Sequence, residues 1–292
     1  MDISQANKIC RDFANNCGNY TDEDLFMFTE AAMYIITETQ DPRYICYLGG
    51  VYYENKKYDL ALKYYEMAAE YDHTPAFLGL GYIWYYGRTG KVDYRKAYEY
   101  YSRAGYDINA WYKLADMYKN GYYVKADYHK YKEIIEDLYL ELEGSDRADQ
   151  PYPEVCTRLA GIREEEGRTD EAVELLRKAK SMLRSRIGFD PFFGNYSIMV
   201  GIINDLYRLT EFDEQHFDLY DLYYLFKKPV KIKFTYNGED CFVESVQEPD
   251  GSLSVKYGEH WYRSVDAFLK NAKIDDKRLT MIPFKLSRFE VV

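Results

Sequence analysis

The residue types that most often carry catalysis or metal binding stand alone in this sequence. Its histidines are His73, His129, His216 and His260, and none has a second histidine three or four residues away. That spacing would place two metal ligands on one helix face. The sequence contains no phosphate-binding glycine loop and no Gly-x-Ser-x-Gly elbow. It therefore predicts a non-catalytic protein without a metal site or a cofactor.

Cysteine chemistry is equally sparse. The cysteines are Cys10, Cys17, Cys46, Cys156 and Cys241. Because their number is odd and no Cys-x-x-Cys occurs, neither a disulfide framework nor a zinc site is predicted. The first residues lack the basic-then-apolar order of a signal peptide, and the longest apolar-rich run is too short to span a bilayer. We therefore expect a cytoplasmic protein that does not bind membranes.

One stretch near the C-terminus combines aromatic and basic groups that could bind a ligand. It contains Lys256, His260, Trp261, Tyr262 and Arg263. Such a mixture is similar to the stacking surfaces of proteins that bind single-stranded nucleic acids. Residues 229–292 carry ten basic and ten acidic side chains, and this balance argues against a strong phosphate-binding face.

The net charge of −11 therefore lies in residues 1–228. An acidic surface repels a phosphate backbone and attracts basic groups. The charge disfavours nucleic acid as a partner of this larger part of the chain, and it favours basic proteins or peptides.

The elements that must position any site are predicted to be helix pairs. Between Pro75 and Gly105, apolar and small residues recur at helical spacing up to Gly87. A second helical pattern begins at Asp93, a residue type that caps helix N-termini. Small residues such as Gly81 occur where two helices must approach closely. The stretch predicts one helix–turn–helix unit.

This unit recurs along the chain. A leucine followed by Gly or Ala marks each copy, at Leu48, Leu80 and Leu114, and a weaker copy begins at Leu159. The landmarks lie about one helix pair apart. Self-similarity at this period indicates a solenoid in which each pair buries its apolar face against its neighbours.

The repeated pattern is Leu-Gly-x-x-Tyr/Trp-x-x-Gly, then Asp-Tyr-x-x-Ala-x-x-Tyr-Tyr-x-x-Ala. It resembles the Sel-one-like repeat (SLR), a branch of the tetratricopeptide superfamily. The resemblance extends over roughly residues 43–186 and does not include the C-terminal part, which resembles no family that we recognise. Known relatives are mostly adaptors that hold partners together, so the resemblance implies an interaction scaffold.

The resemblance also implies which residues line a groove, because the first helix of each pair forms the inner surface in this superfamily. Counted from the leucine landmarks, the groove positions are Cys46, Gly50, Tyr53, Glu54, Leu78, Tyr82, Tyr85, Tyr86, Tyr112, Asp116, Lys119 and Asn120. Trp84 occupies a packing position and is expected to be buried.

Tyrosine is unusually common, at 34 of 292 residues. Its ring packs while its hydroxyl stays polar, so it suits both half-buried helix contacts and partner-binding surfaces. Tyrosines of the second and third repeats form the predicted hot spot, for a partner with apolar or aromatic anchors beside Lys or Arg. In the alternative interpretation these tyrosines only bury one another.

Four segments are predicted. They are N-terminal capping helices over 1–40, three repeats over 41–142, a divergent repeat with connecting helices over 143–228, and a small β-rich domain over 229–292. Within the third segment we expect helices at 197–209 and 213–226, and a solvated basic helix face between 177 and 186. In the fourth, Asn237-Gly238 predicts a hairpin and Ser264 caps a helix.

The fold class is therefore a mainly α solenoid of helix pairs with a small antiparallel β (α+β) domain. The preferred function is a non-catalytic scaffold or adaptor that binds a partner protein or peptide in a concave, tyrosine-rich groove. In the alternative, the C-terminal domain binds nucleic acid or a specific protein. The solenoid would then be its platform in a regulatory or host–phage defence role.

Overall fold

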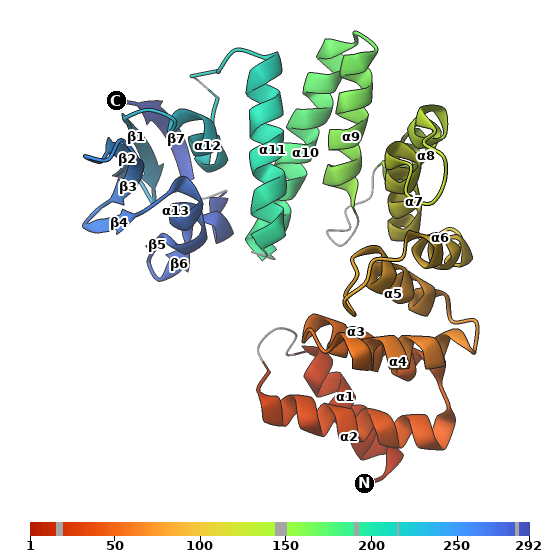
Figure 1. Cartoon of the computed structure of the whole chain (residues 1–292). Helices are drawn as coiled ribbons and strands as arrows, with labels where there is room; N and C mark the ends of the chain where they lie inside the picture. The colour runs from red at the N-terminus through yellow and green to blue at the C-terminus, as the bar shows by residue number, and fades with distance from the viewer. Residues whose placement is uncertain (16–19, 144–150, 190–192, 215, 284–285) are drawn as a thin grey trace. The chain divides into compact units, whose positions relative to one another are not determined.

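The computed structural model describes residues 1–15, 20–143, 151–189, 193–214, 216–283 and 286–292 (Figure 1). It divides into two compact units, Met1–Ile134 and Ile135–Val292. The first unit is helical, and the second combines helices with an antiparallel sheet.

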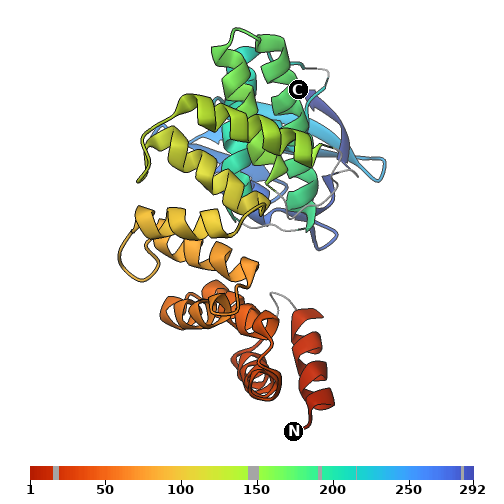
Figure 2. The same ribbon diagram turned by 90° about the vertical axis from the view of Figure 1, so that its right-hand side faces the viewer.

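Unit 1 is built from successive helix pairs. Its helices are α1 (Ile3–Asn15), α2 (Asp22–Thr39), α3 (Pro42–Glu54), α4 (Tyr58–Ala69), α5 (Thr74–Tyr85), α6 (Tyr94–Arg103), α7 (Ile108–Asn120) and the first part of α8 (Tyr128–Leu142). Helix α1 packs on α2, α3 on α4, and α5 on α6. Figure 2 shows these pairs following one another through the unit. The predicted solenoid of helix pairs is confirmed.

Side-chain caps mark the starts of three helices of unit 1, including the predicted start at Asp93. The Thr21 side chain accepts a hydrogen bond from the backbone of Asp24, whose carboxylate accepts one from the Thr21 backbone in return. Asp41 caps α3 ahead of Pro42 at the first helical position, and Asp93 caps α6. These residues satisfy donors that the first turn of a helix leaves without partners.

Close approach of the helices depends on glycines that face tyrosine rings. A Cβ atom added to Gly81 would lie 2.3 Å from Cε1 of Tyr101, and one added to Gly79 would lie 2.5 Å from Cζ of Tyr65. Tyr101 is fully buried. The small residues of the repeat therefore leave the space that these rings fill, as the sequence predicted.

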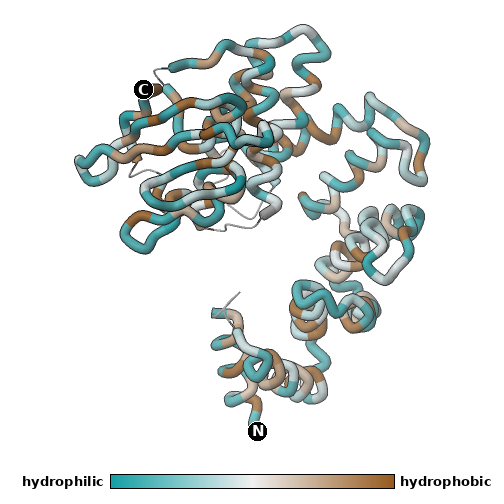
Figure 3. The backbone as a smooth tube through the Cα atoms, turned by 60° about the vertical axis from the view of Figure 1, so that its left-hand side comes forward, coloured by the Kyte–Doolittle hydropathy of each residue, from teal (hydrophilic) through white to brown (hydrophobic). Residues whose placement is uncertain are grey.

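Unit 2 continues the helical pattern and then changes to strands. After the end of α8 come α9 (Tyr152–Glu165), α10 (Thr169–Phe189), α11 (Phe193–Leu209), η1 (Leu219–Asp221) and α12 (Leu222–Leu225). Helix α10 packs against both α9 and α11. Along the helices of both units the chain alternates between hydrophobic and hydrophilic segments (Figure 3), as amphipathic helices do.

The sheet of unit 2 has five strands in the order β4-β3-β2-β1-β7. The strands are β1 (Val230–Tyr236), β2 (Glu239–Gln247), β3 (Leu253–Tyr257), β4 (His260–Tyr262) and β7 (Leu286–Val291). The remaining elements are α13 (Val265–Asn271), β5 (Lys273–Ile274), β6 (Lys277–Arg278) and η2 (Leu279–Met281). Asn237 and Gly238, both at positive φ, join β1 to β2, and Ser264 caps α13. The predicted hairpin and capped helix are confirmed.

The helix predicted over residues 213–226 is wrong. The described residues of this stretch form only η1 and one turn of α12. Asp218 caps η1, and its backbone N–H donates to Asp221. Because this cap fixes the helix start at Leu219, the described residues between 213 and 218 are not helical. Leu219, Leu222 and Phe226 of this stretch are buried, and Tyr223 is half-buried.

The basic face of α10 is only partly solvated: Arg177 is exposed, whereas three of its other cations are paired with carboxylates. Lys180 pairs with Asp221 at 2.5 Å, Arg184 with Asp218 at 3.2 Å, and Arg186 with Glu154 at 2.7 Å. The Lys180 and Arg186 side chains are 14% and 12% exposed. Sequence periodicity could not reveal these carboxylates, because they come from other elements of the chain.

Candidate functional site

The tyrosines predicted for the groove lie on three first helices of unit 1. Tyr53 is near the end of α3, Tyr82 and Tyr85 are on α5 with Tyr86 directly after it, and Tyr112 is on α7. Helix α5 contacts both α3 and α7. We call these five residues the tyrosine cluster.

The ring of Tyr85 lies at the centre of a wider set of aromatic contacts. Its centroid is 5.0 Å from Tyr86, 5.5 Å from Tyr94 and 6.1 Å from Tyr122. Tyr94 and Tyr122 stack on each other at 4.3 Å. These edge-on and stacked arrangements are the favourable ones for aromatic pairs, so the rings support one another.

An arginine covers the α3 side of the cluster. Nε of Arg88 donates a hydrogen bond to the Tyr53 hydroxyl at 3.0 Å. The guanidinium carbon is 4.9 Å from the Tyr86 ring centroid, 5.5 Å from that of Tyr58 and 5.7 Å from that of Tyr53. Within the described residues Arg88 forms no ion pair with a carboxylate. Its positive charge is therefore stabilised by cation–π contacts with these rings.

A lysine holds the α7 side in a similar way. Nζ of Lys113 donates to the Tyr86 hydroxyl at 2.7 Å and lies 5.5 Å from the Tyr112 ring centroid. It is also 3.8 Å from the carboxylate of Asp116. The Lys113 and Asp116 side chains are 14% and 10% exposed, so this pair lies largely within the protein.

Exposure differs within the cluster. Tyr53, Tyr82 and Tyr85 are half-buried, and burial raises the pKa of each hydroxyl. Tyr86 is 42% exposed. Burial likewise raises the pKa of the Glu54 carboxyl at the end of α3. The outward edge of the cluster is therefore formed by Tyr86 and Arg88.

Several predicted groove residues lie elsewhere. Cys46 is buried, and burial raises the pKa of its thiol to about 11. Asp116 is also buried, beside Lys113. Lys119 lies over the ring of Tyr131 at 5.0 Å, and Asn120 donates to the Asp116 carbonyl of its own helix at 2.8 Å. None of these four lies at the outward edge of the cluster.

The remaining predicted positions are neither fully buried nor exposed. Gly50 and Leu78 are half-buried. Trp84 was expected to be buried and is only half-buried, with Nζ of Lys96 3.8 Å from its ring centroid.

Sequence reasoning missed the two cations of the cluster. Arg88 follows Gly87, the helix-ending glycine, and Lys113 is next to Tyr112. Counting positions on first helices could not include Arg88, because it lies in the turn between helices. An arginine directly after an aromatic helix end was the available signal.

The five residues of the predicted C-terminal site do not form one surface. Lys256 of β3 pairs with Trp261 of β4, whereas His260 pairs with Tyr257 and Tyr262 with Val255. Since side chains alternate between sheet faces, Lys256 and Trp261 share one face and His260 and Tyr262 the other. The Tyr262 ring packs on Phe268 of α13 at 5.5 Å, which marks the covered face.

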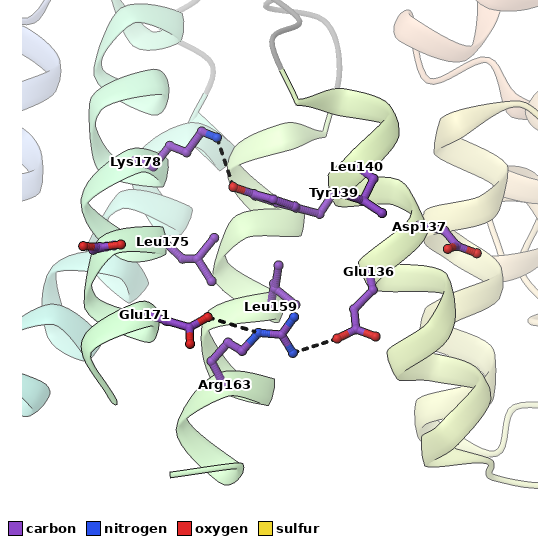
Figure 4. A pocket seen from close by; sticks show the side chains of 10 residues that line it. Glu136, Asp137, Tyr139, Leu140, Leu159, Arg163, Glu171, Leu175 and Lys178 are labelled. Carbon is purple, nitrogen blue, oxygen red and sulfur yellow. Dashed lines mark hydrogen bonds and ion pairs between the residues drawn. The ribbon is translucent and has the colours of Figure 1, made fainter. Parts of the chain in front are cut away.

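A separate pocket of about 590 Å³ lies in unit 2 among α8, α9 and α10 (Figure 4). Arg163 is directed between two carboxylates, with Nη1 2.7 Å from Glu136 and Nε 3.9 Å from Glu171. Lys178 donates to the Tyr139 hydroxyl at 3.2 Å. Because the cations in this pocket already have partners, its polar groups join the three helices to one another.

Two further observations hold for the residues that the structure describes. No three or more His, Cys, Asp or Glu side chains among them gather in a way that could hold a metal ion. No helix among them is long and apolar enough to cross a bilayer.

Solved repeat proteins are similar to this chain. A Sel1 repeat protein from Oxalobacter formigenes is similar over 73% of this chain and 80% of its own, with a TM-score of 0.53 and 19% identity. The protective antigen c5321 of uropathogenic Escherichia coli, which displays an SLR fold, has a TM-score of 0.48 and 18% identity. That match covers 71% of this chain and 49% of the antigen.

No protein-family model and no curated protein matches the sequence. The likeness to the Oxalobacter protein covers most of both chains at low identity, so it concerns the fold. The helix pairs, the glycine contacts between them and this likeness agree. The helical part of the chain has the Sel1-like, tetratricopeptide-like repeat fold that its recurring residues predicted.

Proposed function

We propose that the chain is a non-catalytic interaction scaffold whose tyrosine cluster binds a segment of a partner protein. The observation that carries this proposal is the outward edge of the cluster. Tyr86 is 42% exposed, and Arg88 lies on its ring without a carboxylate partner among the described residues. Exposed Tyr and Arg side chains supply much of the binding energy at protein interfaces.

The half-buried rings make this edge rigid. Tyr86 is held by the Lys113 ammonium on its hydroxyl and by the Tyr85 ring at 5.0 Å. Arg88 is held by the Tyr53 hydroxyl. Side chains that are already ordered lose less conformational entropy on binding. The cluster can therefore bind a partner with little loss of side-chain conformational entropy.

The partner segment should carry an aromatic or apolar anchor for Tyr86 and a carboxylate for Arg88. The acidic composition of the chain attracts basic segments at long range, as the sequence predicted. At the cluster itself, however, the exposed cation beside Tyr86 is the guanidinium of Arg88. A carboxylate can pair with it in the bidentate geometry that arginine favours.

Peptide selection tests this proposal. Random dodecamers displayed on phage are selected on the immobilised full chain, and enriched peptides are measured by fluorescence anisotropy. We expect aromatic residues beside Asp or Glu. Tyr86→Ser with Arg88→Gln should weaken binding about 30-fold, as loss of about 2 kcal/mol at a hot spot implies.

A matched control is Tyr71→Ser with Arg95→Gln, which removes an exposed tyrosine and an exposed arginine of unit 1 outside the cluster. It should bind like the unchanged chain. Tyr85→Ala with Tyr112→Ala is a third variant, measured together with its melting temperature because Tyr85 contacts several rings. Equal binding by the cluster variant and the control would reject the cluster as the site.

A further inference from the structure

The outer face of the C-terminal sheet carries aromatic rings that stand singly in solvent. Phe242 of β2 is 42% exposed and Trp261 of β4 is 55% exposed. Val243, which follows Phe242 on β2, and Val255 of β3, which pairs with Tyr262 next to Trp261, are buried on the opposite face. Since side chains alternate along a strand, Phe242 and Trp261 lie on the face that α13 does not cover.

Cationic side chains accompany both rings. Nζ of Lys231 is 4.8 Å from the Phe242 ring centroid, and Nζ of Lys256 is 5.6 Å from that of Trp261. Cross-strand pairing places Lys231 opposite Glu244, Glu244 opposite Lys256, and Lys256 opposite Trp261. One row across four strands thus contains two lysines and ends on an exposed indole.

The space beside Phe242 is open. A pocket of about 360 Å³ is lined by Phe242, Lys231, Glu244, Lys256 and Gly258, among others. A Cβ atom added to Gly258 would have no heavy atom within 4 Å, apart from its chain neighbours. One flat ring can therefore approach the Phe242 face without meeting a side chain from the end of β3.

The row that ends on Trp261 contains more cations than carboxylates, which favours an anionic group there. Lys231 forms no ion pair in the part of the chain that the structure describes, and Lys256 shares Glu244 at 3.7 Å. Glu244 is the one acidic side chain in the row of Lys231, Lys256 and Trp261. That row therefore carries a net positive charge, whereas Lys233, opposite Phe242 on the same face, is paired with Glu290 at 2.8 Å and with Asp240 at 3.9 Å.

We propose that this sheet face binds single-stranded nucleic acid. Unpaired bases would stack on Phe242 and Trp261, while Lys231 and Lys256 would contact phosphates. The rings lie on strands two apart, roughly 10 Å across the sheet, which leaves room for more than one base. Sheets with exposed aromatic residues bind unpaired bases in this way. The site is independent of the tyrosine cluster.

Fluorescence anisotropy with the full chain tests the proposal. The probes are fluorescein-labelled dT12 and rU12 at 50 mM salt, and the two distinguish DNA from RNA. We expect saturable binding of at least one probe that weakens as salt is raised. Phe242→Ala and Trp261→Ala should each weaken it about tenfold, because one stacked base contributes roughly 1–3 kcal/mol.

Matched controls separate stacking and charge from non-specific effects. Met281→Ala removes an exposed large side chain elsewhere in unit 2, and Lys273→Gln removes an exposed lysine on β5. Both should bind like the unchanged chain, whereas Lys231→Gln should bind more weakly. Circular dichroism should be the same for all variants. Absence of binding by both probes, or equal losses in the controls, would overturn the proposal.

Discussion

The two units hold their helices together in different ways. In unit 1, glycines let tyrosine rings fill the space between helices, as Gly81 does for Tyr101. In unit 2, partly buried ion pairs join α10 to other elements, as Lys180 joins it to Asp221. The first kind of contact depends on shape and the second on charge.

This difference explains why the repeat pattern becomes weaker along the chain. A glycine–tyrosine contact requires a small residue at one fixed position, so it leaves a visible period in the sequence. An ion pair between distant elements requires only that two charged residues meet in space. Thus the repeats of unit 1 are easy to recognise, whereas the last helices of unit 2 show little periodicity.

Loss of the central ion pair should have the largest effect. Lys180→Met keeps the aliphatic stem but leaves the carboxylate of Asp221, which is fully buried, without its cation. We expect the free energy of unfolding to fall by about 3–5 kcal/mol, as for other broken buried pairs. Urea unfolding followed by circular dichroism measures this loss.

The same variant has a defined pH dependence. Burial raises the pKa of Asp221, and the Lys180 ammonium opposes that rise. In Lys180→Met the folded-state pKa should rise further above the unfolded value. The contribution of Asp221 to the free energy of unfolding is then fully present below about pH 4, and it is lost as pH rises through the folded-state pKa of this carboxyl. Arg177→Met, an exposed position of the same helix, should show neither effect.

Overpacking tests the shape-dependent contact of unit 1. Gly81→Leu would drive a side chain into Tyr101, so we expect the free energy of unfolding to fall by roughly 1–3 kcal/mol. Thermal unfolding followed at 222 nm measures it.

Gly161 on α9 provides the opposite case. It is exposed, and an added Cβ would meet no heavy atom within 4 Å beyond its own helix and chain neighbours. Gly161→Ala should therefore raise the free energy of unfolding by about 0.5–1 kcal/mol through helix propensity.

For Gly81→Leu, an unchanged melting curve would contradict the prediction and would show that the ring of Tyr101 can move aside.

Removal of one hydroxyl should have a small effect whose sign depends on whether that hydroxyl has a hydrogen-bond partner. The Tyr101 hydroxyl is buried without a hydrogen-bond partner among the described residues, whereas the Tyr196 hydroxyl shares a hydrogen bond of 3.1 Å with Thr280. Tyr101→Phe should stabilise by about 1 kcal/mol and Tyr196→Phe should destabilise by a similar amount. Chemical denaturation of both variants checks this, and the same sign for both would contradict it.

Much of the fold could be predicted from local signals. The caps at Thr21, Asp41 and Asp93 and the hairpin at Asn237-Gly238 involve residues close together in the sequence. The stretch 213–226 failed because a competing cap at Asp218 starts the helix later. Local propensity cannot decide between two such starts when tertiary contacts favour one.

The candidate sites were less predictable. Tyr85 and Trp261 were both expected at a binding surface, yet the Tyr85 ring is packed against other rings whereas the Trp261 ring is exposed. Phe242 was not expected at all, because its exposure depends on the pairing of β2 with its neighbours. Aromatic content alone does not distinguish a packed ring from an accessible one.

The helix pairs, their period and the change to strands near Val230 are encoded locally, because each depends on short-range spacing of apolar, small and capping residues. Which charges meet and which rings stay exposed depends on tertiary packing. Arg88 on Tyr86, Lys180 on Asp221 and Lys231 on Phe242 join residues from different elements. Such pairings follow from how the elements pack, and no spacing along the chain encodes them.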